Sequence, residues 1–303
     1  MIERILIGYD GSDEARDALS LGAALAARLS ATPVLATCIE GASGQGKDPT
    51  DVAEALFDDA VAHAPALAGE SVGRLTKVGV SGAAGLLDLA SAEDIDLIAI
   101  GSTHRGPVGR VLPGSTALRL VSDGRFPVAI ATRGLAGEAI ASGEVAIAYD
   151  GSEEASNALR FAISLASQTD APVRVLSALG SQAEESAPAL LDRVGDSGAG
   201  DAAEQRDILR RRVERALEYL PAGLGVERVF VEGSPTRAIP NYEMAPSALL
   251  VTGSHGRGPL RSLIFGSVSD ALADASPWPL IVVPPGADHA DEHGAADTRD
   301  PSA

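Results

Sequence analysis

Two segments of this chain of 303 residues, displaced by 152 residues, follow one plan, and this duplication limits how the chain can fold. Each segment is a short apolar run followed by a glycine-rich loop and then by a pattern typical of a helix. The loops cover residues 101–116 and 253–268, and in both the first and last glycines are thirteen residues apart. The repeat predicts two domains of about 150 residues, each large enough for its own core.

Neither loop contains a carboxylate, although the chain has 42 Asp and Glu residues and a formal net charge of −18. Loop 253–268 instead contains one histidine and two arginines. Glycine lets the backbone approach an anion, and the first N–H groups of the following helix point toward it. The sequence therefore predicts a phosphate-binding loop in each repeat.

Short apolar strands alternate with amphipathic helices in both repeats. This order predicts an α/β fold with two tandem doubly wound domains, each with a parallel sheet. The expected strands are 5–9, 34–39, 72–80, 97–100 and 127–131 in the first repeat, and 145–149, 172–178, 229–233, 249–252 and 279–283 in the second. The expected domains are residues 1–133 and 144–285, with a linker at 134–143 and a disordered acidic tail at 286–303.

Some local features lead to narrower expectations. Ser12 and Ser115 are suitable N-cap residues for the helices that follow them. The second repeat is longer by twelve residues between its first strand and its loop, and we place these in a loop at 181–204. Pro240 and Pro246 fall where the second repeat needs a helix, so this helix is expected to be short or kinked.

The first strand of each repeat ends in the same four residues, Tyr-Asp-Gly-Ser, which include Asp10 and Asp150. Ligands of doubly wound sheets bind at the carboxyl ends of the strands, where the strand order switches. If the first and fourth strands are neighbours, a carboxylate faces the phosphate loop across one crevice. A carboxylate suits a ribose hydroxyl and the loop suits phosphates, so the predicted ligand is a nucleotide.

Loop 253–268 fits the pattern Gly-x2-Gly-x9-Gly-Ser. Together with Tyr149-Asp150-Gly151-Ser152, it resembles the ATP-binding signature of the universal stress proteins, and the resemblance covers both repeats. It implies a Rossmann-like, adenine nucleotide alpha hydrolase-like fold with five parallel strands in the order 3-2-1-4-5. It also implies that the two domains pair through their last strands.

The resemblance also implies a set of nucleotide contacts. Asp150 would contact the ribose and Ala178 the adenine, while the glycine loop would hold the triphosphate. In the second repeat the implied residues are Ala148, Tyr149, Asp150, Ala178, Thr252, Gly253, His255, Gly256, Gly266, Ser267 and Val268. In the first repeat they are Gly8, Tyr9, Asp10, Ile39, Ile100, Gly101, Thr103, Gly114, Ser115 and Thr116.

The first repeat departs from the pattern at its second glycine, where it has His104. Either Gly106 allows the loop to take another path, or a side chain at position 104 blocks the phosphates. The sequence therefore predicts nucleotide binding more securely in the second repeat than in the first.

Composition and missing motifs exclude several functions. Aromatic residues make up 3% of the chain, which together with the negative charge argues against nucleic-acid binding. No run of 18 apolar residues predicts a membrane span, and the single cysteine, Cys38, fits a reducing cytoplasm. The chain has no Gly-x4-Gly-Lys-Ser/Thr loop and no Gly-x-Ser-x-Gly elbow, and its cysteine count does not support zinc chemistry.

The expected protein is a cytoplasmic ATP-binding regulator or sensor of the stress response, with Mg²⁺ accompanying the phosphates, and not an enzyme. One alternative is a slow ATPase or an enzyme that transfers phosphoryl or adenylyl groups at the same sites. The other is a scaffold whose nucleotide sites have decayed, which His104 would favour. Whether tandem chains form a homodimer is left open.

Overall fold

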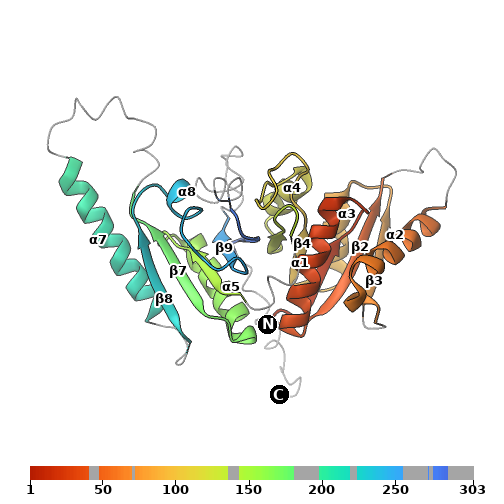
Figure 1. Cartoon of the computed structure of the whole chain (residues 1–303), viewed down its shortest axis with the longest axis horizontal. Helices are drawn as coiled ribbons and strands as arrows, with labels where there is room; N and C mark the ends of the chain where they lie inside the picture. The colour runs from red at the N-terminus through yellow and green to blue at the C-terminus, as the bar shows by residue number, and fades with distance from the viewer. Residues whose placement is uncertain are drawn as a thin grey trace, which may run out of the picture.

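A computed structural model describes residues 1–40, 48–69, 72–135, 143–180, 198–218, 224–254, 272 and 276–285. Ten strands form one continuous sheet in the order β3-β2-β1-β4-β5-β10-β9-β6-β7-β8. Figure 1 shows the two halves of this sheet side by side, with the first domain in red to yellow and the second in green to blue.

The first domain follows the expected alternation of strands and helices. Helix α1 begins after Ser12, whose hydroxyl accepts a hydrogen bond from the N–H of Ala15 at 3.1 Å. Acidic residues occupy its first turn, where they interact favourably with the helix dipole. The elements are β1 (Arg4–Gly8), α1 (Asp13–Leu29), β2 (Thr32–Ile39), α2 (Pro49–His63), a 3₁₀ turn (Pro65–Leu67), β3 (Gly73–Val78), α3 (Gly82–Ala92), β4 (Leu97–Ile100), α4 (Ser115–Asp123) and β5 (Val128–Ile130).

The second domain repeats this plan with two changed helices, α7 and α8. Helix α7 has 20 residues but is rich in charge, and no helix in the described ranges is both long and apolar enough to cross a membrane. The elements are β6 (Val145–Ala148), α5 (Glu153–Thr169), β7 (Val173–Ala178), α7 (Gly198–Leu217), β8 (Val226–Val231), α8 (Pro235–Ala238), β9 (Leu249–Gly253) and β10 (Leu280–Val283).

The strand order 3-2-1-4-5 is confirmed in both domains. Strand β1 lies between β2 and β4, and β6 lies between β7 and β9, with all of these pairs parallel. The last strands of the two domains, β5 and β10, pair antiparallel, with Ala129 opposite Ile281. The expected pairing through the last strands is therefore confirmed, and the strands of one domain run opposite to those of the other.

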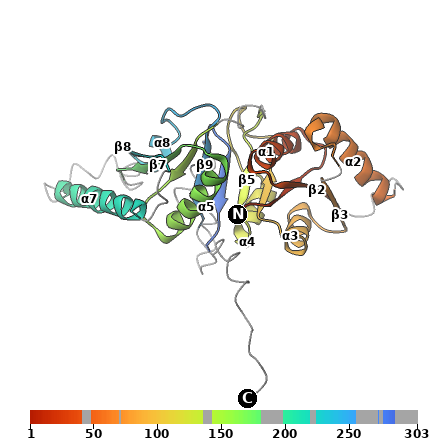
Figure 2. The same cartoon turned by 90° about the horizontal axis from the view of Figure 1, so that it is seen from below.

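Helices cover both faces of the sheet, which explains why its strands are continuously apolar (Figure 2). In β1, Ile5 and Ile7 point into a core shared with α1, whereas Leu6 points into a second core on the other face. Each of the two cores contains residues from both domains, so the domains share their packing as well as their sheet.

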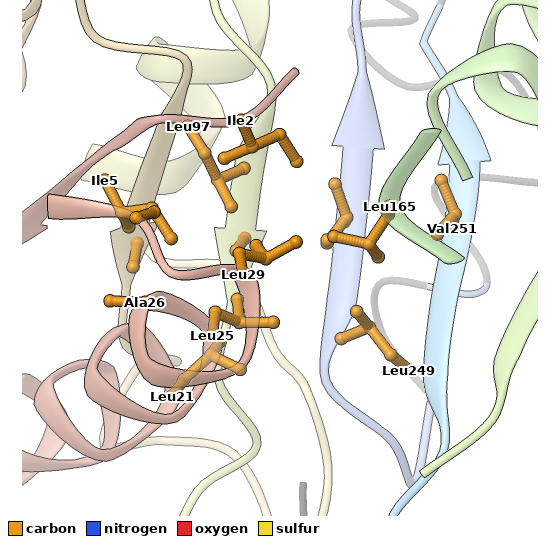
Figure 3. Close-up of a cluster of buried hydrophobic side chains, with 14 of the residues drawn as sticks. Ile2, Ile5, Leu21, Leu25, Ala26, Leu29, Leu97, Leu165, Leu249 and Val251 are labelled. Atoms are coloured by element: carbon orange, nitrogen blue, oxygen red, sulfur yellow. The ribbon is translucent and has the colours of Figure 1, made fainter. Parts of the chain in front are cut away.

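The close-up in Figure 3 shows how the first core crosses the junction between the domains. Leu25 and Leu29 of α1 face Leu165 of α5 and Leu249 of β9 across the paired last strands. All four side chains are buried. Their burial contributes about 1.5 kcal/mol or more for each side chain, so the tandem arrangement is stabilised by packing as well as by strand pairing.

Two local expectations are wrong and a third is confirmed. Ser115 does not cap α4, because the N-cap position is Gly114 and Ser115 is the first helical residue. The loop expected at 181–204 does not extend to residue 204, because α7 already begins at Gly198. The helix before strand four of the second domain is short, as its prolines require, since α8 has only four residues.

Candidate functional site

A pocket of about 560 Å³ opens in the first domain at the carboxyl ends of its strands. Its volume lies within the range of typical small-molecule sites. It is lined by Gly8, Tyr9, Asp10, Ser12, Glu14, Ala15, Ala36, Cys38, Glu40, Gly82, Leu86, Ile100, Gly101, Ser102, Thr103, His104, Gly114, Ser115, Thr116 and Ala117. Nine of the ten residues expected in the first repeat are among them, and the tenth, Ile39, is not.

The pairing of β1 with β4 brings the two halves of the site together. Asp10 follows β1, while Gly101 follows β4 and starts the glycine loop. At Gly101 the loop passes so close to α1 that an added Cβ would lie 2.6 Å from the carbonyl carbon of Glu14. The glycine at this position is therefore required by close backbone packing, and a phosphate need not be present to explain it.

The amino end of α4 provides hydrogen-bond donors to the pocket. The first hydrogen bond of this helix runs from the N–H of Leu118 to the carbonyl of Gly114, and no side chain caps the helix. The N–H groups of Ser115, Thr116 and Ala117 have no acceptor within the part of the chain that the structure describes. All three residues line the pocket. Unsatisfied donors at the positive end of a helix favour an anion.

Asp10 organises the opposite wall. Its Oδ1 accepts hydrogen bonds from the N–H of Ser12 at 3.0 Å and from the Ser12 hydroxyl at 2.6 Å. The other carboxylate oxygen has no partner among the described residues, and the residue is exposed. Asp10 thus has two tasks, since one oxygen fixes the turn before α1 while the other can accept a hydrogen bond from a ligand.

The loop after β4 turns tightly at His104 and Gly106. The N–H of Gly106 donates to the carbonyl of Thr103 at 3.1 Å, which closes a tight turn around His104. Gly106 is buried, and an added Cβ would lie 2.9 Å from the Cβ of Leu112. His104 is exposed at this turn and lines the pocket. Gly106 is therefore required by its packing against Leu112, while the His104 side chain lies at the pocket.

The expectation for Ile39 is wrong by one residue. Ala36 lies opposite Gly8 and Leu176 lies opposite Ala148, so the register of the sheet makes Cys38, not Ile39, the counterpart of Ala178. Cys38 lines the pocket, whereas Ile39 packs into the core on the other face. Side chains alternate along a strand, so this slip of one residue changes the face of the sheet.

Six of the residues expected in the second domain lie within the described part. They lie at the carboxyl ends of neighbouring strands: Ala148 ends β6 and is followed by Tyr149 and Asp150, Ala178 ends β7, and Thr252 and Gly253 end β9. The Asp150 turn matches the first domain, with distances of 2.9 and 2.6 Å to Ser152. His255, Gly256, Gly266, Ser267 and Val268 lie outside the described residues.

Two side chains at the pocket have raised pKa values. Burial raises the pKa of Tyr9 to about 12, assisted by the hydrogen bond from its hydroxyl to the carboxylate of Asp59. That same bond lowers the pKa of Asp59. Burial also raises the pKa of the Cys38 thiol to about 11. At neutral pH the phenol and the thiol are therefore uncharged.

Sequence reasoning missed several lining residues that follow the second and third strands. Glu40 follows β2, and its Oε1 accepts a hydrogen bond from the N–H of Gly82 at 3.3 Å. Leu86 comes from the next turn of α3. Because α3 starts where β3 ends, its first turn reaches the same edge of the sheet. Counting outward from the ends of the second and third strands could have identified these residues.

Comparisons with known proteins agree with this architecture. The family model described as "Universal stress protein family" matches residues 1–132 and 143–284. A universal stress protein of Mycobacterium tuberculosis (strain H37Rv) is 28% identical over 244 residues, which cover 73% of this chain and 75% of the relative. The universal stress protein YxiE of Bacillus subtilis is 26% identical over 148 residues, which cover 45% of this chain and 95% of that protein.

Solved structures show the same fold over most of the tandem chain. A universal stress protein from Archaeoglobus fulgidus has a TM-score of 0.64 at 17% identity, and the match covers 93% of this chain and 98% of that one. One from Pseudomonas aeruginosa has a TM-score of 0.61 at 17% identity and 93% coverage of both chains. With both repeats matched by the family model, the chain belongs to the universal stress protein family.

Proposed function

We propose that this protein binds ATP in the pocket of its first domain and acts as a nucleotide-dependent regulator or sensor in the stress response. One observation carries the proposal: three unsatisfied N–H groups at the start of α4 line a pocket whose opposite wall holds Asp10. The phosphates would accept hydrogen bonds from the N–H groups, and the free oxygen of Asp10 would accept one from a ribose hydroxyl.

The remaining walls suit the other parts of such a ligand. Ala36, Cys38 and Leu86 give an apolar surface for a base, and Glu40 offers an acceptor beside them. No group of three His, Cys, Asp or Glu side chains able to hold a metal ion occurs among the described residues. A Mg²⁺ ion would therefore take its ligands mainly from the phosphates and water, as this ion prefers.

We propose binding and not efficient hydrolysis as the activity. Loop 101–116 contains no carboxylate, and the carboxylates that line the pocket, Asp10, Glu14 and Glu40, come from other segments of the chain. A general base must reach the attacking water beside the terminal phosphate. The uncharged thiol of Cys38 and phenol of Tyr9 do not supply one at neutral pH. The residues at the strand ends of the second domain, among them Asp150 and Gly253, are proposed to bind the same ligand.

The test combines nucleotide detection with a pair of nearly isosteric variants. Mass spectrometry of nucleotide released from freshly purified protein would identify the ligand, and calorimetry would give the number of sites and their Kd. Ser115→Asp places a negative charge at the first residue of α4, and Ser115→Asn is its neutral control. At about 5 Å from a phosphate, one charge costs about 1.4 kcal/mol at an intermediate dielectric, so the Asp variant should bind at least about tenfold more weakly.

Folding should not account for this loss, because an acidic residue in the first turn stabilises a helix. Ser267→Asp and Ser267→Asn repeat the comparison at the sequence counterpart in the second domain and assign each site. Absence of any bound adenine nucleotide would contradict the proposal. Equal Kd values in the two Ser115 variants would remove α4 from the binding site.

A further inference from the structure

A hydrogen bond between the two domains ends in the first domain's glycine loop. The N–H of Val111 donates to the carbonyl of Ser276 at 2.9 Å. Val111 belongs to the loop between β4 and α4, and Ser276 lies just before β10. The antiparallel pairing of β5 with β10 explains this contact, because it places the start of β10 at the edge of the sheet where the first domain's strands end.

Hydrophobic packing also fixes Val111 in place. Val111 is fully buried in the second core together with Leu272 and Trp278 of the second domain. The loop is also held to the segment that follows β5, since the N–H of Gly109 donates to the carbonyl of Arg133 at 2.7 Å. Residues 109–111 therefore lie between the last strand of their own domain and the segment before β10.

Ser276 is itself fixed by its side chain. Its hydroxyl donates to the carbonyl of Trp278 at 2.7 Å and accepts from the N–H of Trp278 at 3.2 Å. The residue has no exposed surface. These two hydrogen bonds make a compact turn that sets the direction of the Ser276 carbonyl, the acceptor for the N–H of Val111.

Only one residue separates this contact from the pocket. The carbonyl of Leu112 accepts from the N–H of Thr103 at 2.8 Å, and its N–H donates to the hydroxyl of Ser102 at 3.1 Å. Ser102 and Thr103 line the pocket. A shift of the chain at Val111 would therefore move the loop wall against which the phosphates would lie.

We propose that Ser276, a residue of the second domain, is a positioning residue for the first domain's pocket. Filling the pocket then changes the surroundings of Trp278, the only tryptophan of the chain. The site proposed for the second domain, at Asp150 and Gly253, lies at the other end of β10, where Val283 pairs with Gly253. Trp278 is five residues from that end, about 16 Å along a strand, so its fluorescence reports on the first pocket. The ligand in this inference rests on the proposed function.

The first test needs no ligand. Amide hydrogen exchange over peptides covering residues 103–113 is compared in the wild type, Ser276→Ala and Ser177→Ala. Ser177 is a matched control, because it is equally buried and its hydroxyl donates to the carbonyl of Tyr149 at 2.8 Å in the second domain. Loss of the Ser276 hydroxyl should raise exchange in the loop about threefold to tenfold, and Ser177→Ala should leave it unchanged.

The second test uses ATP. The wild type should show a change in Trp278 emission that keeps its midpoint in Ser267→Asp and moves to at least about tenfold higher ATP concentration in Ser115→Asp. Ser276→Ala should weaken ATP binding at the first site about threefold to tenfold, while Ser276→Thr, which keeps the hydroxyl, restores it.

The outcomes separate the two proposals. Failure of the wild type to bind ATP would refute the proposed function, and the exchange experiment would still decide whether Ser276 positions the loop. Unchanged exchange in Ser276→Ala would overturn the inference even if ATP binds. So would unchanged Trp278 emission while calorimetry shows that the first site is filled.

Discussion

The substitution Gly101→Ala tests whether the glycine at the end of β4 is required by backbone packing alone. An added Cβ would lie 2.6 Å from the carbonyl carbon of Glu14 and 3.1 Å from its Cα. Ordinary contacts of a Cβ begin at 3.4 Å. The first turn of α1 or the end of β4 would thus have to move by roughly 1 Å to admit one methyl group.

The atoms in the way belong to the backbone, so no change of side-chain rotamer can relieve the overlap. The displaced turn also contains the hydrogen bond between Ser12 and Ala15 that caps α1. Insertion of a methyl group into a packed interior costs about 1 to 3 kcal/mol, and a clash with backbone belongs at the upper end of this range. We therefore expect Gly101→Ala to lower the free energy of unfolding by about 3 kcal/mol, a large part of the 5 to 15 kcal/mol that is typical of a domain.

Urea unfolding followed by circular dichroism measures this loss, with Gly114→Ala as the control in the same pocket. An added Cβ at Gly114 would lie 3.6 Å from the Cβ of Thr103, an ordinary contact, and the φ of −83° suits alanine. Gly114→Ala should lower the free energy of unfolding by less than about 1 kcal/mol, the usual effect of changing an N-cap residue. The reasoning would be refuted if Gly101→Ala were no more destabilising than Gly114→Ala.

Three further predictions concern titratable groups. The raised pKa of Cys38 should make its alkylation at pH 8 about a hundredfold slower than that of an unperturbed thiol, as a rate series with iodoacetamide would show, and ATP should slow it further. Burial raises the pKa of Asp17, so the fold favours its protonated form; this stabilisation is complete below the unfolded pKa and is lost as pH rises through the folded pKa. From pH 3 to 6 the free energy of unfolding of the wild type should therefore fall relative to that of Asp17→Asn. Tyr9→Phe should raise the pKa of Asp59, followed by NMR titration, because the phenol that lowers it is lost; an unchanged value would contradict the hydrogen bond.

The residue pattern was sufficient to predict the fold, because local and repeated signals agreed. The duplicated Tyr-Asp-Gly-Ser turn, the alternation of apolar strands with amphipathic helices and the glycine loops all required two parallel-sheet domains. Family resemblance gave the strand order and the pairing of the last strands, both of which the structure has. In the first domain, nine of the ten expected site residues line one pocket, since strand ends that are neighbours must meet at one edge.

The sequence did not predict the register of the second strand against the first. The sequence placed Ile39 at the site, whereas the hydrogen-bonded register puts Cys38 in the pocket and Ile39 in the opposite core. The position of the loop after β4 likewise depends on a distant residue, Ser276, whose carbonyl accepts from the N–H of Val111. Such choices are made by contacts between residues far apart in the chain, and no local pattern encodes them.

The sequence by itself thus determined the two domains, their parallel strands and the edge at which each site forms, because these follow from hydrophobic periodicity and turn chemistry. Only the tertiary structure decided which side chains enter the first pocket and that Ser276 of the second domain lies against its loop. The physical reason is that antiparallel pairing of β5 with β10 sets the start of one domain's last strand beside the other domain's carboxyl edge.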